Sequence, residues 1–127
     1  MALQATRPES ELRDELAMIA EASGWDWETE HRLVLTNRKE WGRVDLLLER
    51  DDRLVVVECK RTISGNRALR DALAQTWSYT RWFVGKCPKV EGWLITDASA
   101  FVTAPIADEI YGVRFGTPAR FIDWTGP

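Results

Sequence analysis

Two carboxylates, Asp45 and Glu58, occupy corresponding positions in two neighbouring apolar runs of the sequence, 43–49 and 54–60. The runs are rich in Val and Leu, and the acidic segment between them is typical of a β-hairpin turn. If Asp51–Asp52 is a two-residue turn, residues whose numbers sum to 103 face each other, so Asp45 faces Glu58. The sequence therefore predicts two opposed carboxylates with Cβ atoms about 4.5–5.5 Å apart.

Opposed carboxylates inside apolar strands need a positive charge, because burying them without one costs several kcal/mol. Lys60 lies two residues after Glu58 and so on the same face, but one ammonium cannot neutralise two carboxylates. Mg²⁺ or Mn²⁺ would, since these ions prefer carboxylate oxygens and keep several waters. We expect Asp45 and Glu58 to bind the metal, with the backbone carbonyl of Cys59 as a further ligand. Lys60 would orient the water that the metal activates. The alternative is a solvated pair at strand ends, with Lys60 in a surface salt bridge.

Three blocks of the sequence resemble the PD-(D/E)XK nuclease superfamily: Gly42-Arg43-Val44-Asp45, Leu54-Val55-Val56-Val57-Glu58-Cys59-Lys60 and Gln75-Thr76-Trp77-Ser78-Tyr79. The second block contains a Glu-x-Lys pattern after an apolar strand. The third is similar to the Gln-x-x-x-Tyr motif of the RecB-type branch of that superfamily. Val44 stands where the first motif usually has proline.

The resemblance implies a metal-dependent deoxyribonuclease that hydrolyses phosphodiester bonds with a metal-activated water. It adds Gln75 and Tyr79 to the catalytic residues Asp45, Glu58 and Lys60. Many members also carry a metal-binding glutamate on the first helix. Glu15 is our choice because it flanks the apolar stripe of that helix, and Glu11, one turn earlier, is the alternative.

The charge distribution supports a nucleic-acid partner although the net charge is -3. Seven basic residues and one acidic residue lie between Lys60 and Lys89, which gives this segment a local charge of +6. We expect Arg61, Arg67 and Arg70 to contact backbone phosphates. The alternative is a solvated helix face on which charges cluster by chance.

The elements that must position these residues follow from hydrophobic periodicity and from turn residues. The pattern predicts a helix capped by Ser10 and ended by Gly24, strands over 27–35, 43–49, 54–60 and 93–96, and a long helix over 68–83. It further predicts a short helix over 104–111 and a strand over 121–124. Residues 27, 29, 31, 33 and 35 should share the core face of the first strand. The order α-β-β-β-α-β predicts an α/β (α+β) three-layer sandwich with a mixed central sheet flanked by helices. The resemblance implies that this sandwich is of the restriction-endonuclease-like type, which is similar also to Holliday-junction-resolvase-like folds.

Seven tryptophans are many for a chain of this size. Trp77 and Trp93 fit core positions of their predicted elements. Trp25, Trp41 and Trp82 are candidates for stacking on a base, and the alternative for each is core or rim packing.

The length of 127 residues predicts a single domain, 1–127. Two cysteines and one histidine provide neither a disulfide framework nor a zinc site. No apolar run is long enough to span a bilayer, and the first ten residues lack the core of a signal peptide, so we expect a soluble cytoplasmic protein without a membrane partner. The small DNA footprint of one copy suggests a homodimer or a larger complex. Two alternative functions remain: a catalytically silent nucleic-acid-binding or accessory module, and an RNA-directed nuclease.

Overall fold

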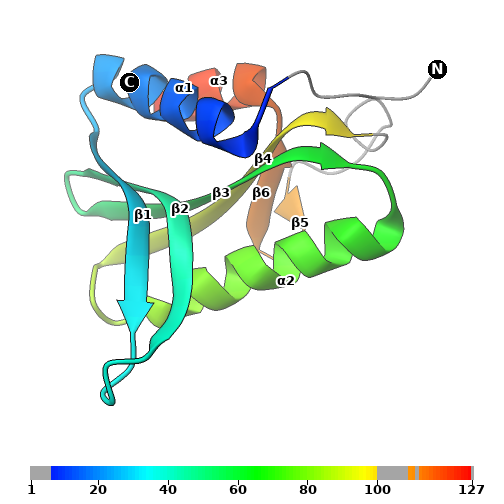
Figure 1. The fold of residues 1–127 in the computed structure, drawn as a ribbon. Helices are drawn as coiled ribbons and strands as arrows, with labels where there is room; N and C mark the ends of the chain where they lie inside the picture. Colours follow the sequence, from blue (N-terminus) through cyan, green and yellow to red (C-terminus); the bar gives the residue numbers. More distant parts are fainter. Residues whose placement is uncertain (1–6, 100–108, 111, 127) are drawn as a thin grey trace.

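The computed structural model describes residues 7–99, 109–110 and 112–126. These residues form one mixed sheet of six strands that is flanked by three helices (Figure 1). Within the sheet the strand order is β1-β2-β3-β4-β6-β5. The ladders β1–β2, β2–β3 and β5–β6 are antiparallel, and β3–β4 and β4–β6 are parallel. In chain order the elements are α1 (Glu9–Ala22), β1 (Asp26–Val34), β2 (Glu40–Arg50), β3 (Arg53–Ile63), α2 (Asn66–Trp82), β4 (Lys89–Ser99), β5 (Glu109–Ile110), β6 (Val113–Gly116) and α3 (Pro118–Thr125).

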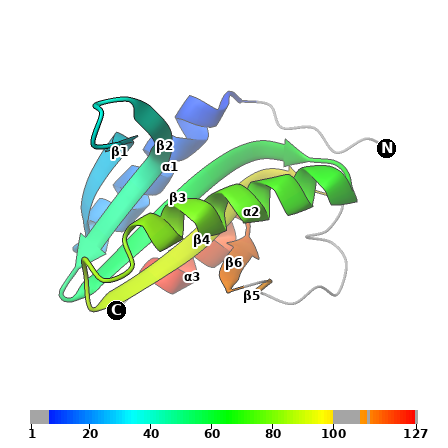
Figure 2. The ribbon, with the colours of Figure 1, turned by 90° about the horizontal axis from the view of Figure 1, so that it is seen from below.

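The helices form the two outer layers. Helices α1 and α3 lie together on one face of the sheet, and α2 crosses the other face (Figures 1 and 2). The predicted three-layer α/β sandwich, with its mixed sheet and the order α-β-β-β-α-β for the first six elements, is confirmed.

The hairpin of β2 and β3 has the predicted register. Arg50 pairs with Arg53 and Leu48 with Val55 across a two-residue turn. Asp51 adopts a positive φ of 57°, which a hairpin turn of this length requires. Both strands are internal to the sheet, and the ladder stops at the pair Leu46–Val57, one position before the two carboxylates.

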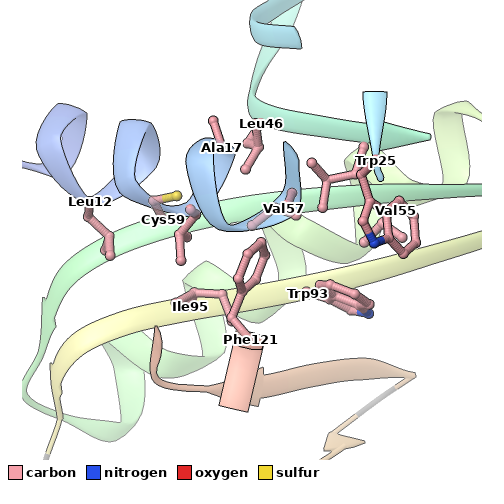
Figure 3. Close-up of a cluster of buried hydrophobic side chains, with 13 residues drawn as sticks. Leu12, Ala17, Trp25, Leu46, Val55, Val57, Cys59, Trp93, Ile95 and Phe121 are labelled. Carbon is pink, nitrogen blue, oxygen red and sulfur yellow. The ribbon is translucent and has the colours of Figure 1, made fainter. Parts of the chain in front are cut away.

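The core beneath α1 and α3 is built around Trp93, which is fully buried on β4 (Figure 3). The Trp25 and Phe121 rings pack against it with centroids 6.3 and 5.7 Å away. Trp93 therefore occupies the predicted core position. Trp25 is also buried, with 2% of its surface exposed, so the structure contradicts its candidacy for stacking on a base.

Helix α2 buries one stripe on the opposite face of the sheet, consisting of Leu69, Ala72, Leu73 and Thr76. Trp77 follows that stripe by one residue, and successive residues of a helix point about 100° apart. Its side chain consequently turns outward and is 48% exposed, so the prediction that Trp77 belongs to the core is wrong.

Side-chain alternation changes face in the middle of β1 and β2. Trp27 donates a hydrogen bond to a glutamate of α1, whereas the His31 ring contacts the end of α2 on the other side of the sheet. On β2, Leu46 belongs to the core beneath α1, and Val44 belongs to the core beneath α2. Glu30 lies between the two halves of β1 and adopts a positive φ of 54°. The prediction of a single core face along this strand is therefore wrong.

The last described segment is helical rather than extended. Residues 121–124 were predicted to form a strand, but they belong to α3. An apolar run of four residues fits either state, and the signal that favours a helix is Pro118 at its first turn. The strand in this region is β6, which the sequence pattern did not indicate. Of the helix predicted over 104–111, only Glu109 and Ile110 are described, and they form β5.

Helix α1 begins two residues earlier than predicted. Pro8 rather than Ser10 occupies the N-cap position, and no side chain caps the helix. At the other end Gly24 adopts a φ of 84°, as expected of a glycine that follows a helix. None of the helices in the described ranges is both long and apolar enough to span a membrane.

Candidate metal and catalytic site

Asp45 and Glu58 exchange hydrogen bonds with each other's strand. The Asp45 N–H donates to Glu58 Oε2 at 3.1 Å, and the Cys59 N–H donates to Asp45 Oδ2 at 2.8 Å. These bonds replace the ladder, which ends one position earlier. Beyond this point β2 pairs with β1 alone and β3 with β4 alone, so the sheet forks at the two carboxylates (Figure 1). The opposition that the register predicted is thus present.

The two carboxylates lack a direct cationic partner. Glu58 is buried with 2% of its surface exposed, and Asp45 is half-buried. Neither forms an ion pair with any residue of the described ranges. The pKa of Glu58 is raised far above its ordinary value, first by burial and then by the hydrogen bond and the charge of Asp45. The charge of Lys60 lowers that pKa, but it is the last of the causes in order of size. Glu58 therefore keeps its proton at neutral pH when no cation is bound, and a divalent ion that binds the pair would have to displace that proton.

The oxygen atoms of Asp45 and Glu58 are of the kind that a hard divalent cation prefers as ligands. Each carboxylate uses one oxygen for a backbone N–H and has a second oxygen for a ligand. The N–H and C=O of one strand residue point to the same side, so the Cys59 carbonyl points toward Asp45. No group of three or more His, Cys, Asp or Glu side chains that could bind a metal occurs in the described ranges. A metal here would have two carboxylates and a carbonyl as protein ligands, with water at its other positions.

Cys59 contributes its backbone rather than its thiol. The side chain is 1% exposed and packs in the core beneath α1. Burial raises the pKa of the thiol, and the charges of Asp45 and Glu58 raise it further. A thiol in this state is not a nucleophile at neutral pH.

Lys60 and Gln75 meet in one cleft. The cleft has a volume of about 350 Å³ and lies between the end of β3 and the first half of α2. Its lining also includes Asp71, one helical turn before Gln75. Sequence analysis did not single out Asp71, although it is the one acidic residue of the basic segment.

Gln75 and Tyr79 act as a pair on α2. The Gln75 amide donates to the Tyr79 hydroxyl at 3.2 Å. The Tyr79 ring packs directly on Gly42, where a Cβ atom would lie 2.5 Å from the nearest ring carbon. The first and third blocks are thus in contact, and the contact requires a residue without a side chain at the start of the first block.

The structure does not bring Glu15 to the carboxylate pair. Glu15 is 44% exposed and forms a 2.5 Å ion pair with Arg7, which also binds Asp97 through two hydrogen bonds of 2.8 Å. The alternative, Glu11, is exposed as well. A cavity of about 120 Å³ beside Asp45 is lined instead by Glu9 at the start of α1, together with Ser10, Arg13 and Glu30. The angle at which α1 crosses the sheet decides which of its turns lies over Asp45, and the apolar stripe of the helix does not reveal that angle.

The arginines that were predicted to bind phosphates are not neutralised by acidic side chains of the described residues. Arg61 on β3, and Arg67 and Arg70 on α2, are exposed and form no ion pair with the described residues. By contrast, acidic partners neutralise several arginines elsewhere in the described ranges, namely Arg7, Arg13, Arg32, Arg43 and Arg53. The positive charge of these three arginines is therefore available for a ligand.

The same fold is found in the crystal structure of AF1548, a protein of unknown function. The TM-score is 0.57 at 15% sequence identity, over 87% of this chain and 58% of that chain. This chain thus spans somewhat more than half the length of AF1548, and at such an identity the likeness concerns the fold alone. No protein-family model and no curated protein matches the sequence.

Proposed function

We propose that the protein is a metal-dependent deoxyribonuclease that hydrolyses phosphodiester bonds in DNA. The observation that carries the proposal is the contact between Asp45 and a buried Glu58 that has no ion-pair partner among the described residues. The likeness to the PD-(D/E)XK superfamily in three blocks, which meet around α2 and the β2–β3 hairpin, supports the same reading. We further propose that the protein acts in the cytoplasm.

In this proposal different residues bind the metal, orient the water and position the β2 strand. Asp45, Glu58 and the Cys59 carbonyl bind Mg²⁺ or Mn²⁺, which supplies an acidified water and offsets charge on the phosphoryl oxygens. Lys60, two residues after Glu58 on β3, lines the cleft together with Gln75, and we assign its ammonium the role of orienting the attacking water. Gln75 and Tyr79 hold the position of the β2 strand through the contact with Gly42.

Cleavage of labelled DNA with Mg²⁺ or Mn²⁺ tests the proposal. Glu58→Gln keeps an acceptor for the Asp45 N–H and removes the charge, so it should abolish cleavage without unfolding the protein. Lys60→Ala should do the same. Glu49→Gln removes an exposed carboxylate from the same strand as Asp45 and serves as the control, with full activity expected. Full activity in either site variant would overturn the mechanism.

The second candidate function is a binding module without catalysis. It is favoured by the finding that the described residues contain no group of three or more His, Cys, Asp or Glu side chains that could hold a metal ion. Calorimetric titration with Mn²⁺ separates the two candidates. A nuclease should bind the ion in a manner that Asp45→Asn abolishes, and a silent module should show no such binding. Parallel assays with matched RNA test the third alternative, an RNA-directed nuclease.

A further inference from the structure

Three aromatic side chains form a cluster where β2 begins and α2 ends. The Trp41 and Trp82 rings are stacked, with centroids 5.3 Å apart and planes 14° from parallel. Tyr79 meets Trp41 edge-on, with centroids 5.6 Å apart. Trp41 nevertheless remains 46% exposed. A large exposed aromatic side chain held by two others is preorganised to bind a flat ligand.

Positive charge surrounds this cluster. The Lys86 ammonium lies 4.7 Å from the centre of the Trp82 ring. Arg38 and Lys39 precede Trp41 in the β1–β2 turn, which projects beyond α2 in Figure 1. Both are exposed, and neither forms an ion pair with a residue of the described ranges. The ligand that fits such a surface has a flat aromatic part and a negative charge.

A continuous row of side chains joins the cluster to the proposed catalytic cleft. Gln75, Tyr79 and Trp82 follow one another at helical spacings of four and three, so they share one face of α2. Gln75 lines the cleft with Lys60, Tyr79 bonds to Gln75, and Trp82 stacks on Trp41. Seven helical residues span about 10 Å, which is the length of a few nucleotides.

We propose that Trp41 and Trp82 form a stacking platform for an unpaired base, so that the substrate is single-stranded DNA. This inference rests on the proposed nuclease function, whose substrate it specifies. Bases in a duplex hide their faces in the stack, whereas unpaired bases stack readily on aromatic side chains. The nearby lysines and arginine match the charge of the phosphates on either side of such a base.

Binding of a short fluorescein-labelled oligo(dT), measured by anisotropy in EDTA, tests the platform independently of cleavage. Trp41→Ala should weaken binding about ten-fold or more, since base stacking contributes that much per base. Trp41→Tyr should restore most of it. Trp27→Ala is the matched control, because Trp27 is also exposed, at 39%, but bonds to Glu21 of α1 on the other face of the sheet, and its binding should equal that of the wild type. Circular dichroism checks that each variant is folded.

The outcomes separate the platform from the proposed function. A Trp41→Ala variant that binds oligo(dT) as tightly as Trp27→Ala would overturn the platform, even if the wild type cleaves DNA. An equal loss of binding to a duplex of the same length would also overturn it. If the Trp41 dependence holds and no DNA is cut with Mg²⁺ or Mn²⁺, the nuclease proposal fails and the platform stands.

Discussion

Asp45 and Glu58 have two roles at the residue scale. Each accepts a backbone N–H of the opposite strand, and together they form the proposed metal site. Removing either side chain would leave a backbone donor without its partner, which costs about 1–3 kcal/mol when the donor is buried. Isosteric amides are therefore the informative substitutions, because they separate the charge of the site from its structural role.

We expect Glu58→Gln to raise the melting temperature of the metal-free protein at pH 8 by a few degrees. The pKa of Glu58 in the folded protein lies above its ordinary value of 4.5, mainly because of burial. Between pH 4.5 and about pH 10, which is the pKa of Glu58 in the folded protein, the folded state retains a proton that the unfolded state has lost. The stability of the wild type therefore falls as the pH rises through this range. Glutamine carries no such penalty. Melting curves in EDTA should coincide near pH 4 and diverge in favour of the variant at higher pH.

Addition of Mn²⁺ is the companion measurement to these melts. The ion binds the folded wild type and should raise its melting temperature, while the variant should respond little. Parallel pH profiles of the two metal-free proteins would contradict the raised pKa of Glu58.

Gly42→Ala should destabilise the protein by about 1–3 kcal/mol, as overpacking does in a filled site. The added Cβ would lie 2.5 Å from the Tyr79 ring. Denaturant unfolding measures the loss. In a Tyr79→Ala background the obstacle is gone, so the same glycine substitution should cost less than about 0.5 kcal/mol. An equal cost in both backgrounds would exclude the contact as its cause.

Residue types and register were sufficient to predict that Asp45 and Glu58 lie against each other. Across a two-residue turn at Asp51–Asp52, residues whose numbers sum to 103 face each other, which places Asp45 opposite Glu58. Strand periodicity places Lys60 on the face of Glu58. The approach of Glu9 to Asp45 was not predictable, because it depends on the packing of α1 across the sheet. Asp71 was likewise missed, since its place in the cleft depends on how α2 lies over β3.

At the scale of elements, periodicity succeeded wherever a long run gave it enough residues. The long helix and the central hairpin were predicted close to their observed bounds, α2 at Asn66–Trp82 and the hairpin at Glu40–Ile63. Short runs failed, because four apolar residues do not distinguish a period of 2 from one of 3.6. The change of face at Glu30 could not be predicted either, because no sequence pattern marks a single residue with positive φ in a strand.

Helix α3 gives a direct test of the corrected element. Phe121 is fully buried against Trp93, so Phe121→Ala should cost about 3–5 kcal/mol in unfolding free energy. Ile122 is 53% exposed, and Ile122→Ala should change stability by less than about 0.5 kcal/mol. Comparable losses at the two positions would argue against the helix as described.

At the scale of the whole molecule, the net charge of -3 hides an uneven distribution. Acidic partners neutralise arginines around α1, β1 and β2, while Arg61, Arg67 and Arg70 remain without one among the described residues. The overall charge opposes broad adhesion to nucleic acid. We therefore expect DNA binding to depend on localised groups of basic side chains, these three arginines among them, and to be sensitive to salt.

Replacing Arg61, Arg67 or Arg70 by Ala should lower the slope of log affinity against log salt by about 0.7–1 each. The slope counts the counterions that each phosphate contact releases. Arg53→Gln is the control, because Arg53 lies at the opposite end of β3 and pairs with Glu91 at 2.7 Å. Binding titrations at several salt concentrations measure the slope. A change in the control as large as in the three variants would refute a localised contact region.

The fork in the sheet has a mechanical consequence. On one side of Asp45 and Glu58, β2 and β3 are fastened by their ladder; on the other side they form two separate arms, β1 with β2 and β3 with β4. Because no ladder hydrogen bond joins β2 to β3 across the opening, other contacts hold the angle between the arms, among them the Tyr79 ring of α2 against Gly42 of β2. The carboxylates lie at the vertex, where a change of that angle displaces atoms least. The spacing of the proposed metal ligands therefore depends little on how far apart the arms are held.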